Sequence, residues 1–355
     1  MDLKKIFIKS ACPTKIGGQA ILEGIMMKGA DRTAIVIRKP NGDMHIKITP
    51  LPAMLKWKKI PVIRGVFIFI DALVTGTKTI LYSAEVLENS SGGEAYEPDK
   101  LTLWLEKKFG EKAALSVMLY FSVAIAIIFT IGVFIIMPTW GVNVFSLLIK
   151  NEVALNLFEG ALRILMFVGY VALISRMKDI RTVFQFHGAE HNCIHCYENG
   201  LPLTPENCSR FETLHPRCGT SFLMFVMVIS LLLFSLLGWP NLLWRIASRL
   251  LLIPLIAGLS YELLRLAGKG DSAFIKILSL PGLWLQKLTT LRPDEKQLEV
   301  AIAAVKAVLE TEGPREFIGL TDMEGNLYPE TEAALSGKKM TDTEKVPEGL
   351  RDQAL

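Results

Sequence analysis

Four of the five histidines lie in one short region, and their spacing is typical of a metal site. His187, His191 and His195 recur every four residues within segment 186–198, and His215 follows in Leu-His-Pro-Arg-Cys. Histidines one helical turn apart can bind one divalent ion together. We therefore expect a divalent metal here. Zinc suits imidazole and thiolate ligands best, and iron or manganese would suit a site that also uses carboxylates.

The histidine segment is predicted to be a helix that ends near Glu198, because Asn-Gly-Leu-Pro directly after it is a helix stop signal. On that helix His187, His191, His195 and Glu198 share one face, with Glu190 at its edge. His187 and His195 would be about 12 Å apart along the axis, which is too far for one shared ion.

Two arrangements remain open. In the first, His187 and His191 hold one ion, and His215, Cys218 or an acid supplies the third ligand. In the second, the same face binds two ions, and His195 and Glu198 serve the second.

The order His187-Gly-Ala-Glu190-His191 also matches the H-x-x-E-H pattern of inverted zincins, in which the glutamate activates water. By that analogy Glu190 is the general base. Cys193 and Cys196 point away from the histidines and are expected to pack as small apolar side chains. We favour Arg217 as a positive anchor at the membrane over a role in binding an anionic substrate.

The elements that position these residues are mostly membrane helices. The chain has 355 residues, 51% of them hydrophobic, with a mean hydropathy of +0.37, which is typical of a membrane protein. The sequence contains no stripe of interleaved basic and aromatic residues, so nucleic-acid binding is not expected. Four stretches are long enough to span a bilayer: 114–137, 157–175, 220–239 and 243–267. The placement of Lys and Arg predicts that both termini and the loop 176–219 are cytoplasmic, at the cell membrane.

The remaining segments are predicted to lie outside the bilayer. Residues 1–113 should form a small cytoplasmic α+β domain, with a β-hairpin around Pro40-Asn-Gly and a membrane-associated helix over 60–82. A polar linker follows over 89–98. Residues 268–312 should be a helical cytoplasmic extension that includes an amphipathic helix over 293–310. The polar tail 313–355 is expected to be mobile.

Three motifs resemble a known family. Segments 17–29, 184–198 and 213–222 are similar to the YqhQ-like family of bacterial membrane proteins of unknown function, described as predicted metal-dependent enzymes. The similarity covers roughly residues 17–310. It implies that Gln19 and Glu23 belong with the histidines, with Glu23 as a second acid or an outer partner of a ligand.

The sequence thus predicts a mainly α, polytopic membrane protein with about four spans and a small α+β domain. The leading interpretation is a metal-dependent membrane enzyme, and we favour a hydrolase, with His187, His191 and His215 as ligands and Cys218 or His195 completing the set. The alternative is a membrane scaffold, assembly factor or transport component with a structural metal. The absence of polar groups deep in the first and third predicted spans counts against ion transport.

Overall fold

The computed structural model describes residues 6–7, 14, 16–51, 60–90, 108, 111–145, 150–237, 241–267, 272–309 and 316–328. Most of the predicted linker 89–98 and the part of the tail after 328 lie outside this description. The chain divides into two compact units. A sheet unit comprises Met1–Gly92, Val171–Phe225 and Ala257–Leu355, and a helical unit comprises Gly93–Tyr170 and Val226–Ile256.

The sheet unit contains a six-stranded antiparallel meander in which spatial order follows chain order. Its strands are β1 (Gly17–Ile21), β2 (Gly24–Lys28), β3 (Arg32–Arg38), β4 (Met44–Pro50), β5 (Phe317–Thr321) and β6 (Leu327–Tyr328). The predicted hairpin is confirmed by β3 and β4, and Gly42 in its turn has a φ of +97°, which favours glycine.

The last two strands show that the first part of the tail predicted to be polar and mobile belongs to the sheet. β5 pairs with β4, with Thr321 opposite Met44, and Leu320 is only 2% exposed. The apolar run Phe-Ile-Gly-Leu is too short to give a helical periodicity, but it suffices for a strand once an edge is available to pair with.

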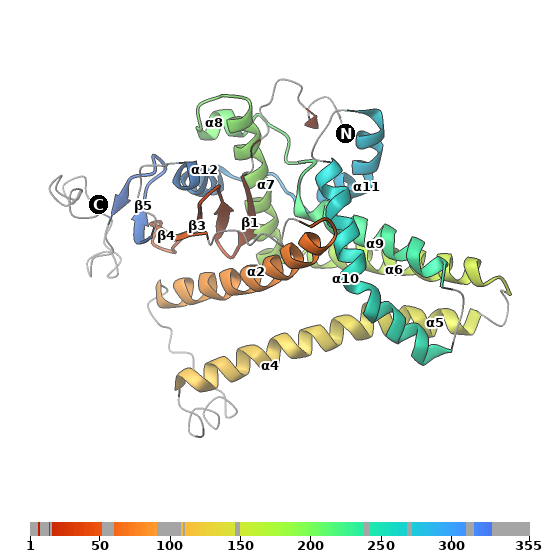
Figure 1. Ribbon diagram of the computed structural model, residues 1–355. Helices are drawn as coiled ribbons and strands as arrows, with labels where there is room; N and C mark the ends of the chain where they lie inside the picture. Colours follow the sequence, from red (N-terminus) through yellow and green to blue (C-terminus); the bar gives the residue numbers. More distant parts are fainter. Residues whose placement is uncertain are drawn as a thin grey trace. The chain divides into compact units, whose positions relative to one another are not determined.

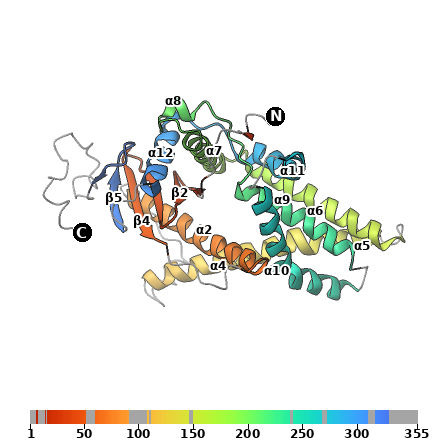
Figure 2. The same cartoon turned by 45° about the horizontal axis from the view of Figure 1, so that its top comes forward.

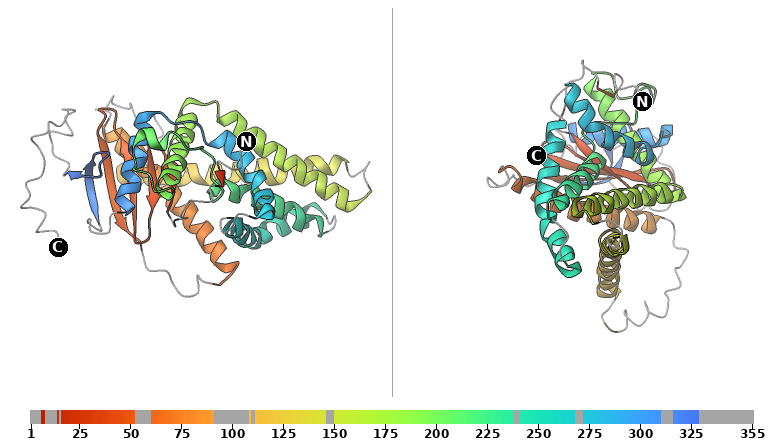
Figure 3. Two further views of the ribbon diagram at one scale, coloured as in Figure 1. Left: turned by 90° about the horizontal axis from the view of Figure 1, so that it is seen from above. Right: turned by 90° about the vertical axis from the view of Figure 1, so that its right-hand side faces the viewer.

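Helices cover both faces of this sheet (Figure 1). On one face lie α7 (Lys178–Glu198) and α12 (Glu295–Leu309), which is the predicted amphipathic helix. On the other face lies α2 (Ile63–Ser90), through Tyr82, Val86 and Leu87 (Figure 2, Figure 3). Alternate side chains of a strand point to opposite faces, so Ile25 and Val36 meet α7 and α12 while neighbouring residues meet α2.

Four helices among the described residues are long and apolar enough to span a membrane: Ile63–Ser90, Ala124–Phe145, Glu152–Ile174 and Leu243–Ala267. The first of them is α2. The second runs through α4 (Glu111–Ile131), η2 (Gly132–Ile136) and α5 (Met137–Phe145), and the last two are α6 (Glu152–Ile174) and α10 (Leu242–Ala267). A shorter apolar helix, α9 (Gly219–Ser235), lies before α10. The number of spans agrees with the prediction, but their identity differs. α9 has 17 residues and is short for a span, whereas α2 is long enough despite five charged side chains along its length.

A buried charge cluster ties the helical unit together. Glu159 on α6 accepts hydrogen bonds from Arg163 Nη2 at 2.8 Å and from Arg249 Nη2 at 2.6 Å. Arg249 also donates to Thr139 Oγ1 at 2.8 Å, which connects α5, α6 and α10. The charges that interrupt two predicted spans therefore neutralise one another in part. The fold is that of a mainly α polytopic membrane protein with a small antiparallel sheet.

Candidate metal centre

Helix α7 presents two chemically different faces. Phe186, Ala189, Cys193 and Cys196 are buried in the core between α7, α12 and the sheet, together with Cys208 of the short helix α8 (Pro205–Cys208). The histidines occupy the opposite side. The predicted orientation of Cys193 and Cys196, away from the histidines, is confirmed.

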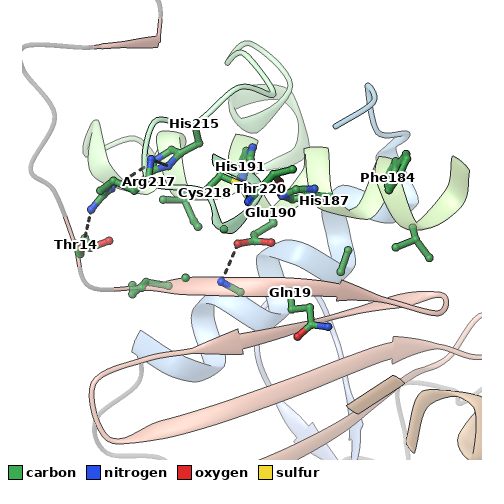
Figure 4. A pocket seen from close by; sticks show the side chains of 17 residues that line it. Thr14, Gln19, Phe184, His187, Glu190, His191, His215, Arg217, Cys218 and Thr220 are labelled. Carbon is green, nitrogen blue, oxygen red and sulfur yellow. Dashed lines mark hydrogen bonds between the residues drawn. The ribbon is translucent and has the colours of Figure 1, made fainter. Parts of the chain in front are cut away.

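Two α7 histidines and one loop cysteine form a compact group of ligand atoms (Figure 4). His187 Nε2 lies 3.1 Å from Cys218 Sγ, and the rings of His187 and His191 have centroids 4.6 Å apart. One ligand atom from each of the three residues lies within 4.8 Å of the others. Two imidazoles and a thiolate are a donor set that zinc accepts.

Backbone carbonyls orient both imidazoles. His187 Nδ1 is 2.9 Å from the carbonyl oxygen of Thr289, and His191 Nδ1 contacts the carbonyl oxygen of Thr213. A carbonyl can only accept, so each Nδ1 carries the proton and each Nε2 keeps a lone pair. Burial lowers the pKa of His187, which favours the neutral form that binds metal.

Glu190 lies beside this group with one unused oxygen. Its Oε1 accepts the backbone N–H of Gly18 at 2.8 Å, whereas Oε2 is buried and has no hydrogen-bond partner among the described residues. Burial raises the pKa of Glu190, and the nearby His187 and the Gly18 N–H oppose that effect. Residue 18 must be glycine, because a Cβ there would lie 2.6 Å from the carbonyl oxygen of Met26 and 3.1 Å from the Glu190 carboxyl carbon.

His215 faces a different pair of charges. Its Nδ1 accepts the backbone N–H of Arg217 at 3.3 Å, and its Nε2 lies 4.0 Å from Glu198 Oε2. Arg217 forms an ion pair with Glu198 and donates to the carbonyl oxygen of Thr14 at 2.6 Å. Burial opposes ionisation of Glu198, but hydrogen bonds from His215, Thr14 and Arg217 outweigh it and lower its pKa to about 2. Arg217 therefore connects α7 to the segment before β1.

His195 is held away from the candidate centre. Its Nε2 donates to the carbonyl oxygen of Leu214 at 3.0 Å, and its ring stacks on Phe211. Burial lowers the pKa of His195 to about 4. Because Glu198 is also engaged by Arg217, the arrangement with a second ion at His195 and Glu198 gains no support. Of the ligands expected from sequence, the structure brings together His187, His191 and Cys218.

The side chains of Gln19 and Glu23, which the family resemblance placed with the histidines, lie apart from them. Glu23 is exposed in the turn between β1 and β2, with a φ of +48°, and it does not line the cavity at the candidate centre. The Gln19 side chain points from β1 toward α2, where its amide lies against Gly76 (Figure 4). The structure thus places the backbone of β1, and not these side chains, next to the histidines.

Two contacts that position the candidate metal centre come from α11 (Ala273–Thr289) and from the segment after it, and the sequence did not predict either of them. Gln286 accepts the backbone N–H of His215 at 2.8 Å and donates to its carbonyl oxygen at 2.9 Å. Gly188 admits the carbonyl oxygen of Leu291, which would lie 1.9 Å from a Cβ at that position. The sequence indicated Gln286 only weakly, as a single amide in an apolar helical segment. Nothing in the sequence could indicate the backbone carbonyls of Thr289 and Leu291.

A cavity of about 380 Å³ opens onto the centre. Residues 16–20 of β1 and its flank form one wall, and α7 with the segment 215–220, which includes the start of α9, forms the other (Figure 4). His187, His191, Glu190 and Cys218 all line it. The candidate ligands can therefore be reached by a small molecule or by part of a larger one.

Comparison with known proteins identifies relatives of this chain, but their descriptions name no activity. Residues 60–311 match the family described as protein of unknown function (DUF1385). The chain is 34% identical over 316 residues to the uncharacterized protein YqhQ of Bacillus subtilis (strain 168), covering 87% of this chain and 96% of the relative. No solved structure matches.

Proposed function

Since the chain belongs to DUF1385, a family of unknown function, its activity has to be inferred from the site, and we propose that it is a metal-dependent membrane hydrolase. The observation that carries the proposal is the buried Glu190 Oε2, without a partner in the described part of the chain, beside two histidines and a cysteine whose ligand atoms converge. A buried carboxylate oxygen without a partner is costly to maintain, which argues for a role in chemistry.

The residues present fit a divalent ion. His187 Nε2, His191 Nε2 and Cys218 Sγ would hold it, with zinc as the first candidate and iron or manganese as alternatives. When bound, such an ion supplies positive charge that acidifies water and polarises a carbonyl. Three protein ligands beside a cavity are typical of a catalytic zinc site, whereas a structural site is closed by four. This favours the enzyme over the scaffold.

Glu190 is the proposed general base. Its Oε1 accepts the Gly18 N–H, which leaves Oε2 available to accept a proton from water. Glu190 Oε2 takes one proton from water while the water oxygen bonds to the acyl carbon of the substrate. The same carboxyl group then gives that proton to the leaving group as the acyl bond breaks. The raised pKa of Glu190 suits an oxygen that both accepts and returns a proton.

We place the centre at the cytoplasmic face of the cell membrane, with both termini on the same side. The support is the excess of Lys and Arg before the first predicted span and in the loop 176–219. Its residues lie on α7 and directly before α9, and neither helix is among the four that are long and apolar enough to span a membrane.

The test is elemental analysis of the full chain purified in detergent. We expect about one ion per chain in the wild type and in Glu190→Gln, and loss of the ion in His187→Ala, His191→Ala and Cys218→Ser. His45→Gln is the matched control, because His45 bonds Tyr82 outside the cavity. Glu190→Gln should keep the ion and lose hydrolysis of an activated ester. A wild type that takes up no zinc, iron or manganese would overturn the proposal.

A further inference from the structure

One edge of strand β1 pairs with no strand in the described part of the chain, where only β2 pairs with β1. Successive backbone groups of a strand point to alternate edges. The Gly18 N–H points away from β2, because it donates to Glu190. Two residues further along, the N–H and C=O of Ala20 must point in the same direction, toward the cavity.

This edge forms a wall of the cavity that contains the candidate centre. Residues 16–20 line it, and the His187–Glu190–His191 face of α7 lies opposite. A strand edge with unused donors and acceptors is a template for a further extended chain. A substrate paired with Ala20 would lie alongside Glu190, since Gly18 belongs to the same edge.

The rest of the lining suits an uncharged backbone with apolar side chains. Ile16, Val183, Phe184 and Ile194 contribute apolar surface. Within the described part of the lining, Arg217 is the one cationic side chain, and it already serves Glu198 and the Thr14 carbonyl. A phosphate ester would meet no available cationic side chain there, whereas a polypeptide needs none.

We propose that the substrate is a polypeptide bound in extended form along the outer edge of β1, which makes the protein a peptidase at the membrane surface. The inference rests on the proposed hydrolase function. The water oxygen bonds to the peptide carbonyl carbon and the C–N bond breaks. One water proton passes through Glu190 to the leaving nitrogen, and the other stays with the new carboxyl group. The products are one peptide with a carboxyl end and one with an amino end.

Ala20→Pro is the decisive variant. Proline removes the N–H that points to the cavity, and it leaves the β1–β2 hydrogen bonds intact because that N–H does not face β2. The preceding residue, Gln19, is already extended, as a residue before proline prefers. Ala20→Val is the matched control, because it changes the side chain and keeps the N–H.

The experiment uses the full chain in nanodiscs, with Glu190→Gln in every variant so that bound peptides are not cleaved. A random octapeptide library is passed over the immobilised protein, retained peptides are identified by mass spectrometry, and their affinities are measured by fluorescence anisotropy. We expect Ala20→Pro to bind them about tenfold more weakly and Ala20→Val to bind them normally. N-methylation of alternate peptide nitrogens should weaken binding in one register and not in the other.

Three results would overturn the inference. The library could yield no retained peptide, Ala20→Pro with an unchanged melting temperature could bind as well as Ala20→Val, or N-methylation could have no register dependence. Retention of dioleoyl phosphatidic acid vesicles in place of peptides would also overturn it and indicate a lipid ester. The two proposals fail separately: hydrolysis of a small ester without peptide binding refutes only the peptide substrate, and peptide binding without metal refutes the hydrolase.

Discussion

Gly188 sits where α7 meets the segment after α11, and its replacement by alanine tests how the ligands are oriented. A Cβ at this position would lie 1.9 Å from the carbonyl oxygen of Leu291, and real Cβ contacts begin near 3.0 Å. The two segments must therefore separate by about 1 Å. The same segment supplies the Thr289 carbonyl that holds His187 Nδ1 at 2.9 Å, and the Leu291 N–H that donates to Phe184 at 2.9 Å.

A separation of that size stretches both hydrogen bonds beyond effective range. We expect Gly188→Ala to unfold more easily by about 1–3 kcal/mol, the usual cost of overpacking. Loss of the carbonyl that orients a ligand should weaken zinc binding about 10–100-fold. Competition with a chromogenic chelator measures the affinity, and thermal unfolding in detergent measures the stability.

Gly169→Ala on α6 is the control, because a Cβ there has no neighbour within 4 Å among the described residues. This helical substitution should leave zinc binding unchanged and should not destabilise the protein. If Gly188→Ala bound zinc as tightly as Gly169→Ala, the Thr289 carbonyl would not be what orients His187, and the reasoning would be refuted.

Three other perturbations follow from the same contacts. Gln286→Leu strands the N–H and C=O of His215, so we expect a loss of roughly 1–3 kcal/mol for each group and weaker zinc binding, measured by thermal unfolding and chelator competition. Glu159→Gln removes the charge that compensates two buried arginines, and we expect a loss of about 3–5 kcal/mol in the same unfolding assay. N-ethylmaleimide should label Cys218 faster than Cys208, whose pKa is raised by its hydrogen bond to a neighbouring thiol and by burial; peptide mapping measures both, and zinc should protect Cys218.

The two substitutions have control variants, and the two cysteines serve as controls for each other. Lys287→Gln lies next to Gln286 but is exposed, and Glu85→Gln removes an exposed carboxylate of α2, so both should be close to neutral. Unfolding of Glu159→Gln at the wild-type temperature would show that the cluster does not stabilise the helical unit. Equal labelling of Cys208 and Cys218, or labelling of Cys218 that zinc does not slow, would argue against Cys218 as a ligand.

The features that the sequence alone determined are local. The stop signal after Glu198 predicted the end of α7, and the four-residue spacing placed His187 and His191 on one face because helical periodicity depends only on neighbouring residues. The Pro-Asn-Gly turn predicted the β3–β4 hairpin for the same reason. Long apolar runs predicted a membrane protein, because a bilayer constrains each span separately.

Only the tertiary structure decided which residues lie together at the candidate centre. Cys218, and not His215, converges with the two histidines, because Gln286 and the Arg217–Glu198 pair hold His215 in another direction. The carbonyl of Thr289 and strand β5 come from segments far from His187 and β4 in the sequence. No spacing of neighbouring residues predicts such contacts. A backbone N–H or C=O is the same at every position of a sequence, so only the folded chain could show that β1, and not Glu23, faces the histidines.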